Sequence, residues 1–163
     1  MNIWERHTEL EGIFYSHCQS IISKIPTPKL KEAHKFKDSG SIIIEGIKFI
    51  DDSILNFSES LHIGNIERYS YEYIQPTGFF FLYENEGVEN GIRKPLHHLH
   101  VGIMKEHADD TLLESLPKPL IEHKGPHFIA PRISFDQFMG MIIVNFFNED
   151  NRNCDRMLRS LGL

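Results

Sequence analysis

Cysteines, long apolar runs and excess basic charge are all scarce in this sequence. Of its 163 residues, only Cys18 and Cys154 are cysteines, which are too few for a disulfide framework and are typical of free thiols in a reducing cytoplasm. The N-terminus has no charged segment followed by an apolar stretch, so we expect no signal peptide. The longest apolar run, FMGMIIVNFF, has about half the length that a membrane helix needs. We therefore expect a cytoplasmic protein without a membrane segment.

The composition is that of an ordinary globular protein. Hydrophobic residues make up 40% of the chain and charged residues 25%, and neither an internal repeat nor a low-complexity segment is present. This length suits one domain over residues 1–163 that buries a real core. The net charge of −6 argues against broad, non-specific binding of nucleic acid, while leaving room for a local basic patch.

The N-terminal segment has the spacing of an amphipathic helix. Apolar residues recur three and four positions apart from Ile3 to Ile22, which predicts a helix over residues 2–24. The following IPTPK ends it, because proline cannot donate to the helical hydrogen bonds. The polar stretch after it, KLKEAHKFKDSG, has no clear period.

From residue 41 to about residue 104 the period changes to two. Short β-branched or alternating segments are separated by turn signals such as GN at Gly64 and QPTG before Phe79. About five consecutive strands with short turns predict an antiparallel meander, which commonly buries one face and leaves the other in contact with water.

Helical signals return in the last part of the chain, over about residues 109–161. Ser134 and Gln137 form a capping-box pattern at the start of an apolar helix, and Ile133 and Phe138 occupy the positions of a hydrophobic staple. A sheet flanked by helices predicts an α+β fold, with the N-terminal and C-terminal helices packed on one face of the sheet.

The segment from Pro117 to Arg132 is rich in proline and is predicted to be an irregular surface loop. It carries His123 and His127. We predict that it forms a mobile flap close to the histidine-rich strand described next.

Three histidines fall within four positions of RKPLHHLHVGIM, at the start of a predicted strand. Because side chains alternate along a strand, His98 and His100 share one face, while Leu99 and Val101 point to the other and look like core. We therefore expect His98 and His100 on the solvated face. Such a pair suits proton transfer, or a metal ion if His123, His127 or Glu84 adds a third ligand, or it is simply hydrated.

Glu59 interrupts an otherwise apolar face of its strand. A carboxylate there lies either at the sheet edge or beside a buried partner, and a buried pair would suggest a site. Arg68 suits the bidentate binding of a phosphate, although hydration at the surface explains it equally well.

Four short segments together carry a resemblance to a known family. They are FSESL with Glu59, RYSYEY from Arg68, LYEN ending at Asn85, and HHLHV from His97. In this order and spacing, the stretch from Asp51 to about Val101 resembles the TumE-like toxins of prokaryotic toxin–antitoxin systems. The tail PRISFDQFMGMIIVNFF is similar to the closing helix of that family.

The resemblance has two departures. The family pattern has an arginine and an aspartate where this chain has Leu82 and Glu84. The resemblance implies a toxin with an antitoxin protein as partner, and by analogy of architecture an RNA-cleaving enzyme. The reaction would be attack of a ribose 2′-hydroxyl on its own phosphate, with one histidine as base and another as acid. The alternatives are a non-enzymatic binding domain and a metal-dependent hydrolase with His98 and His100 as ligands.

For the toxin we predict no metal, no cofactor and no membrane partner, with RNA as the substrate. The oligomeric state stays open. The residues predicted to be catalytic are His98, His100, Arg68, Tyr71 and Glu59. The residues predicted to bind substrate are His97, Arg93, Asn85 and Glu84.

Overall fold

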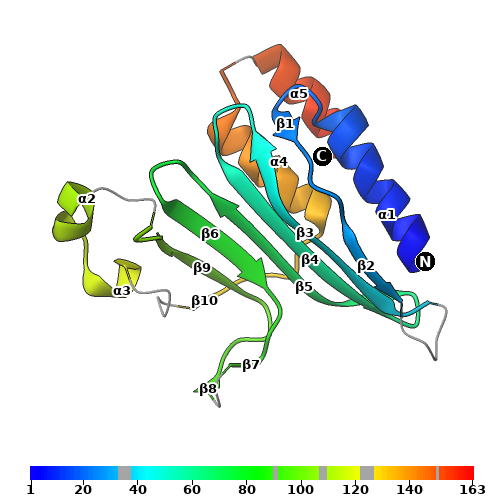
Figure 1. Cartoon of the computed structure of the whole chain (residues 1–163), viewed down its shortest axis with the longest axis horizontal. Coiled ribbons are helices and arrows are strands. Elements are labelled where there is room, and N and C mark those ends of the chain that lie inside the picture. Colours follow the sequence, from blue (N-terminus) through cyan, green and yellow to red (C-terminus); the bar gives the residue numbers. More distant parts are fainter. Residues whose placement is uncertain (33–37, 90–91, 107–109, 122–126, 150) are drawn as a thin grey trace.

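A large antiparallel sheet occupies the centre of the molecule, and helices from both ends of the chain pack on it (Figure 1). The structure, a computed structural model, describes residues 1–32, 38–89, 92–106, 110–121, 127–149 and 151–163. In these residues the predicted α+β fold is confirmed.

The main sheet has eight strands in the order β1-β3-β4-β5-β6-β9-β10, and β2 also pairs with β3. These strands are β1 (Ile22–Lys24), β2 (Lys29–Glu32), β3 (Gly40–Phe49), β4 (Ile54–His62), β5 (Asn65–Ile74), β6 (Phe79–Glu84), β9 (His98–Ile103) and β10 (Phe128–Ile129). A separate hairpin is made of β7 (Val88–Glu89) and β8 (Ile92–Arg93). The five predicted strands correspond to β3, β4, β5, β6 and β9, and the sheet gains β1, β2 and β10.

Both predicted turns are present. Gly64 and Gly78 have φ angles of 77° and 83°, and they connect β4 to β5 and β5 to β6. Glycine has no Cβ, so it adopts this left-handed conformation at little cost. The short turns keep consecutive strands adjacent and antiparallel.

The helices are shorter than the sequence pattern predicted. They are α1 (Ile3–Gly12), the π-helical η1 (Ile13–His17), α2 (Asp110–Ser115), α3 (Lys118–Ile121), α4 (Phe135–Phe146) and α5 (Asn151–Ser160). The predicted helix over residues 2–24 is therefore wrong at its C-terminal end. There, Ile22 pairs with Phe49 of β3, and the carbonyl of Ile21 accepts the amide N–H of Ile50 at 2.9 Å. Pairing with the sheet replaces the last turns of the helix.

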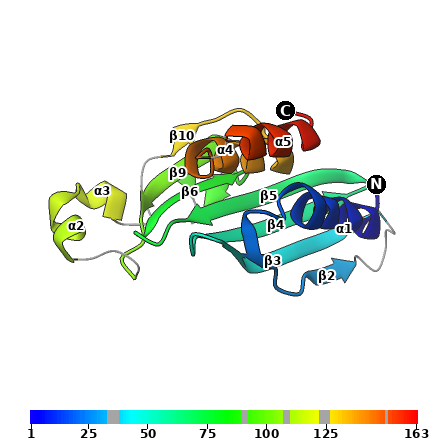
Figure 2. The ribbon, with the colours of Figure 1, turned by 90° about the horizontal axis from the view of Figure 1, so that it is seen from above.

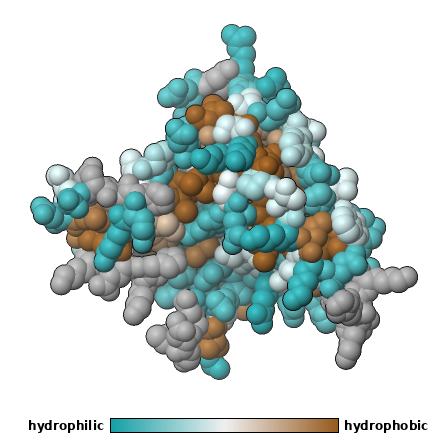
Figure 3. All heavy atoms as spheres, viewed as in Figure 1, coloured by the Kyte–Doolittle hydropathy of each residue, from teal (hydrophilic) through white to brown (hydrophobic). Residues whose placement is uncertain are grey.

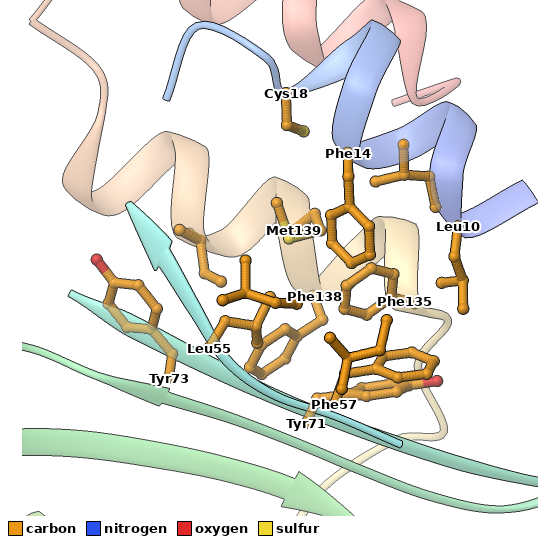
Figure 4. Close-up of a cluster of buried hydrophobic side chains, with 14 of the residues drawn as sticks. Leu10, Phe14, Cys18, Leu55, Phe57, Tyr71, Tyr73, Phe135, Phe138 and Met139 are labelled. Atoms are coloured by element: carbon orange, nitrogen blue, oxygen red, sulfur yellow. The ribbon is translucent and has the colours of Figure 1, made fainter. Parts of the chain in front are cut away.

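The main core lies between the sheet and the helices α1, α4 and α5, which cover the same face (Figure 2). Figure 4 shows Phe14 and Phe135 above the side chains of the central strands. The ring of Phe135 meets Phe57 edge-on at 4.8 Å, and Phe57 stacks on Tyr71 at 5.5 Å between ring centroids. The predicted packing of both terminal helices on one face is confirmed.

The predicted capping box starts α4. The Ser134 hydroxyl accepts the amide N–H of Gln137 at 3.3 Å, and the Gln137 side chain accepts the amide N–H of Ser134 at 2.9 Å. These bonds satisfy donors that a helix N-terminus otherwise leaves unpaired, and so they fix where the chain enters the helical layer.

On the opposite face of the sheet α3 packs against β9, and Figure 1 shows α2 and α3 to the left of β6 and β9. A smaller apolar cluster lies on this face, formed by Ile74, Phe80 and Leu82. The segment from Pro117 to Arg132 was predicted to be an irregular loop. Its described residues contain two regular elements, α3 and β10. Pairing of β10 with β9 supplies hydrogen bonds that the local sequence does not signal.

The surface visible in Figure 3 is largely hydrophilic, with hydrophobic side chains gathered in patches between hydrophilic ones. None of the helices in the described ranges is long and apolar enough to cross a membrane. Cys18 and Cys154 are free and buried, and burial with the nearby charge of Asp136 raises the pKa of Cys18 to about 12. The predicted free thiols are therefore confirmed.

The contact between α3 and β9 can be tested at Gly102. A Cβ at this position would lie 2.7 Å from the carbonyl oxygen of Leu120 and 2.9 Å from the ring of Phe80. We expect Gly102→Ala to lower the free energy of unfolding by about 1–3 kcal/mol, because the backbone of α3 must move. Denaturant titration would measure the change.

The matched control is Gly12→Ala, since a Cβ at Gly12 meets nothing within 4 Å and Gly12 has helical φ and ψ angles. We expect the control to be unchanged or stabilised by up to about 1 kcal/mol. Equal stability of both variants would contradict the close packing of α3 on the sheet.

Candidate functional site

Eight of the nine residues predicted as one site lie in three separate places. The first is a buried polar cluster on the face opposite α4, and the second is a surface pocket near the ends of β5 and β9. The third is an ion pair inside the main core. These three places differ in burial and in chemistry.

Glu84 is the centre of the buried polar cluster. Its Oε1 atom lies 3.1 Å from Nζ of Lys94, 2.9 Å from Nε2 of His98 and 3.2 Å from Nε2 of His100. We call these four residues the Glu84 cluster. Three nitrogen atoms converge on a single carboxylate oxygen.

Strand register positions this cluster. Glu84 is the last residue of β6 and pairs with His98 of β9, while Leu82 pairs with His100. Alternation along β9 sends Leu99 and Val101 into the main core and the two histidines to the other face, as predicted. The Nδ1 atom of His98 lies 2.8 Å from the carbonyl oxygen of Pro95, which fixes the plane of the ring.

The prediction that His98 and His100 are solvent-accessible is wrong. Their exposed fractions are 0% and 4%, and the side chain of Glu84 is 15% exposed. Sequence alternation separates the two faces of a strand but does not report what covers the second face. Here α3 and His127 pack against the face of β9 that carries His98 and His100.

The electrostatics of the Glu84 cluster favour an ionised carboxylate. Burial alone raises the pKa of Glu84, but hydrogen bonds from His100 and Lys94 and the positive charge of Lys94 outweigh burial. Together they lower the pKa to about 2. At neutral pH a negative charge is therefore held inside a largely buried site.

His127 joins this cluster from the predicted flap. Its ring centroid lies 4.3 Å from that of His100 and 5.2 Å from that of His98. The prediction that the flap lies near these histidines is confirmed for His127, and His123 lies outside the described residues. One ring nitrogen from each of the three histidines lies within 4.8 Å of the other two, a grouping that can hold a metal ion.

The second place is a surface pocket of about 490 Å³, which we call the Arg68 pocket. Two arginines, a histidine, an asparagine and two glutamates contribute its polar lining, with apolar residues between them. The lining residues are Ile66, Glu67, Arg68, Asn85, Glu86, Gly87, Val88, Leu96, His97 and Arg132.

His97 in this pocket is held by Tyr69. The Tyr69 hydroxyl lies 3.1 Å from Nδ1 of His97, and the two rings stack 5.9 Å apart at an angle of 11°. Burial lowers the pKa of His97, and the positive charges of Arg132 and His98 lower it further. The neutral imidazole is therefore favoured at pH 7.

Asn85 forms part of the wall of the pocket. Its side-chain oxygen accepts the amide N–H of Tyr69 at 2.6 Å, and its side-chain nitrogen donates to the carbonyl of Glu67 at 2.6 Å. Both polar groups therefore hold the chain after β6 against β5. Arg132 donates to the carbonyl of Ile66 at 3.1 Å, which ties the segment before α4 to the same strand.

The third place is the ion pair of Arg6 and Glu59. The Nε and Nη2 atoms of Arg6 lie 2.8 Å and 2.7 Å from the two oxygens of Glu59, and the Tyr71 hydroxyl donates to Glu59 at 2.6 Å. Glu59 is 0% exposed and Tyr71 is 1% exposed. Glu59 and Tyr71, which were predicted to be catalytic, lie in the core beneath α1. The contact of Glu59 with Arg6 joins α1 to the sheet.

Arg93 belongs to none of these places. It is exposed on β8 and pairs with Val88 in the separate hairpin. It does not line the Arg68 pocket. A role in binding substrate stays a prediction for Arg93, without a contact in the described residues that supports it.

Three positively charged residues that were not predicted from the sequence lie at these places. Arg6, Lys94 and Arg132 each place a positive charge next to a predicted residue or pocket. The signal for Arg6 was its position on the buried face of the predicted helix, three residues after Ile3 and four before Leu10. Lys94 and Arg132 lie in segments without helical or strand periodicity, so no local sequence pattern indicated a role for them.

Comparison with known families agrees with the resemblance found in the sequence. The model of a family described as Toxin TumE matches residues 24–123, which is more than half of the chain. The match includes β2 to β9 and the whole Glu84 cluster, but not Arg6, His127 or Arg132. No curated protein and no solved structure matches the chain.

The structural role of Glu59 can be tested by a double-mutant cycle with Arg6. We expect Arg6→Met to lower the free energy of unfolding by about 3–5 kcal/mol, because it leaves the buried carboxylate of Glu59 without a cation. Glu59→Leu should cost less, because Arg6 keeps its second partner, Glu9, at 3.0 Å. The double variant should lose clearly less than the sum of both, since no charge remains buried. Chemical denaturation of the four proteins gives the coupling energy, and simple additivity would argue against the pair as a structural unit.

Proposed function

Because this chain belongs to the toxin TumE family, we propose that it is the toxin of a toxin–antitoxin pair and that it cleaves RNA at the Arg68 pocket. The observation that carries the proposal is the lining of this pocket. Arg68, Arg132 and His97 all line one cavity of about 490 Å³.

The two arginines provide the binding chemistry for a phosphate. A guanidinium group donates two parallel N–H bonds to phosphate oxygens and stays charged at every relevant pH. Arg68 comes from β5 and Arg132 from the segment before α4, so they reach the pocket from different elements. The neighbouring Glu67 and Glu86 limit the positive charge to a small area, in agreement with the acidic net charge of −6.

His97 supplies the base. The ribose 2′-oxygen attacks the adjacent phosphorus, its proton passes to the imidazole of His97, and the bond from phosphorus to the 5′-oxygen breaks. The 5′-oxygen takes a proton from solvent, which leaves a 2′,3′-cyclic phosphate and a 5′-hydroxyl end. Tyr69 orients the ring for this step through its contact with Nδ1 of His97.

This proposal moves the proton transfer from the predicted pair to His97. In the structure the Nε2 atoms of His98 and His100 both face Oε1 of Glu84, and both rings are buried. A base and an acid for phosphodiester cleavage must reach two different oxygens of the substrate. His97, in contrast, lines the open pocket.

The proposed partner is an antitoxin protein that neutralises the activity. The competing function for the same pocket is binding of RNA without cleavage, as in the binding-domain alternative. Both functions use Arg68 and Arg132, but only cleavage needs His97 as a base. The chemical state of the RNA separates them.

We expect Arg68→Gln, Arg132→Gln and His97→Asn each to relieve growth inhibition in a bacterial host that expresses the chain. Loss of the base should slow cleavage by about 10²–10⁴-fold, and loss of one arginine should weaken phosphate binding. The measurements are the growth rate after induction and RNA cleavage in vitro, including detection of the 2′,3′-cyclic phosphate end.

The matched control is Arg159→Gln, which removes an exposed arginine of α5 outside the pocket. We expect this control to keep full toxicity, and both the control and Arg68→Gln to keep the unfolding temperature, because both side chains are exposed. Arg132→Gln and His97→Asn each lose one hydrogen bond, to the carbonyl of Ile66 and to Tyr69, so their unfolding temperatures are measured together with their toxicity. RNA that is bound but intact would support the binding alternative. Unchanged toxicity of the three pocket variants would remove the pocket from the function.

A further inference from the structure

The face of the sheet opposite α4 brings three histidines together at a carboxylate, and no step of the proposed RNA cleavage uses them. We propose that His98, His100, His127 and Glu84 bind one Zn²⁺ ion. The ion fastens His127, which lies between α3 and β10, to strands β6 and β9. The site goes beyond the proposed RNA cleavage and does not depend on it.

The distances within the cluster suit a tetrahedral ion. Ligands at about 2.0–2.1 Å from zinc in a tetrahedral arrangement lie about 3.3 Å from one another. Oε1 of Glu84 lies 2.9 Å from Nε2 of His98 and 3.2 Å from Nε2 of His100. One ring nitrogen from each of His98, His100 and His127 lies within 4.8 Å of the other two, so these three ligands must draw closer, to about 3.3 Å, when the ion binds.

The outer contacts are those that metal ligands need. His98 places Nδ1 at 2.8 Å from the carbonyl of Pro95, which sets the tautomer with Nε2 available for the ion. Lys94 holds Oε1 of Glu84 at 3.1 Å and so fixes the position of the carboxylate. Ligating histidines and carboxylates are commonly held by such a second layer of hydrogen bonds.

Burial indicates the kind of site. His98 and His100 are 0% and 4% exposed, so a polynucleotide does not reach them. Four protein ligands close the coordination of zinc, which is the arrangement of structural rather than catalytic zinc sites. Imidazole nitrogens also favour zinc over magnesium or calcium, which prefer ligand sets made of oxygen.

The ligands connect distant parts of the chain. Glu84 ends β6, His98 and His100 belong to β9, and His127 follows α3 and directly precedes β10. An ion bound to all four therefore crosslinks the segment that covers this face to the two strands beneath it. Metal binding of this type contributes directly to the stability of the folded state.

The competing explanation is that Lys94 already neutralises Glu84 and that the four residues of the Glu84 cluster hold this face together without an ion. The experiment must therefore use protein that was never exposed to a polyhistidine tag or a nickel column. Its probe is zinc sulfate, added to untagged full-length protein after treatment with a chelator.

We expect wild-type protein to bind one equivalent of Zn²⁺, measured by elemental analysis and by competition with a coloured chelator. His127→Gln and Glu84→Gln should each weaken binding by at least about tenfold. His62→Gln, at an exposed histidine of β4, is the matched control and should bind like wild type. Added zinc should raise the unfolding temperature of wild type and of the control, but not of the His127→Gln variant.

Two measurements keep the test decisive if a variant folds poorly. Circular dichroism of each chelator-treated protein shows whether it is folded, and Co²⁺ added to wild type should give the strong visible absorption of a tetrahedral site. A folded wild-type protein that takes up no more zinc than His127→Gln, with no shift in unfolding temperature, would overturn the proposal. Loss of RNA cleavage in pocket variants that still bind zinc separates the failure of one proposal from that of the other.

Discussion

The buried pair of Arg6 and Glu59 is the constraint on which the arrangement of the layers depends. Glu59 occupies the same face of β4 as Leu55 and Phe57, so its charge enters the core with them. An unpaired carboxylate there would cost far more than its apolar neighbours gain. Arg6 of α1 supplies the positive charge that pairs with Glu59 of β4. This contact fixes the position of α1 along the sheet as well as across it.

With α1 and α4 on one face, the chemistry of the opposite face follows from strand alternation. Each residue of β9 that contributes to the main core alternates with one that points away from it. His98 and His100 therefore meet Glu84 of β6 across the strand pair, on the face that the terminal helices do not cover. The segment with α3 then removes this polar row from solvent. The Arg68 pocket lies elsewhere, beside the first residues of β5 and the chain that follows β6.

The elements with a clear period could be predicted from the sequence, and contacts between distant segments could not. Strands β4 and β5 alternate over enough residues to show their buried faces, β3 and β6 are short β-branched or apolar runs between turn signals, and the Ser134 cap is a local signal. β2 has the polar sequence KLKE and becomes a strand only by pairing with β3. The partner of Glu59 lies 53 positions away, and the cover over His98 comes from a segment rich in proline. Local patterns therefore selected polar residues and predicted one site, whereas the structure places eight of these residues in three separate places and Arg93 in none of them.

The two departures from the family pattern can be understood from the Glu84 cluster. Leu82 pairs with His100 and joins the apolar cluster of Ile74 and Phe80, so it has no polar role on this face. An arginine at position 82 would project on the same face as the carboxylate two residues later, because side chains of a strand repeat every second residue. Here Lys94, from the segment before β9, places the positive charge at 3.1 Å from Glu84 instead. Glutamate has one methylene more than aspartate, and this greater reach lets one oxygen meet Lys94, His98 and His100 together. In this chain the cation beside the buried carboxylate therefore comes from the segment before β9.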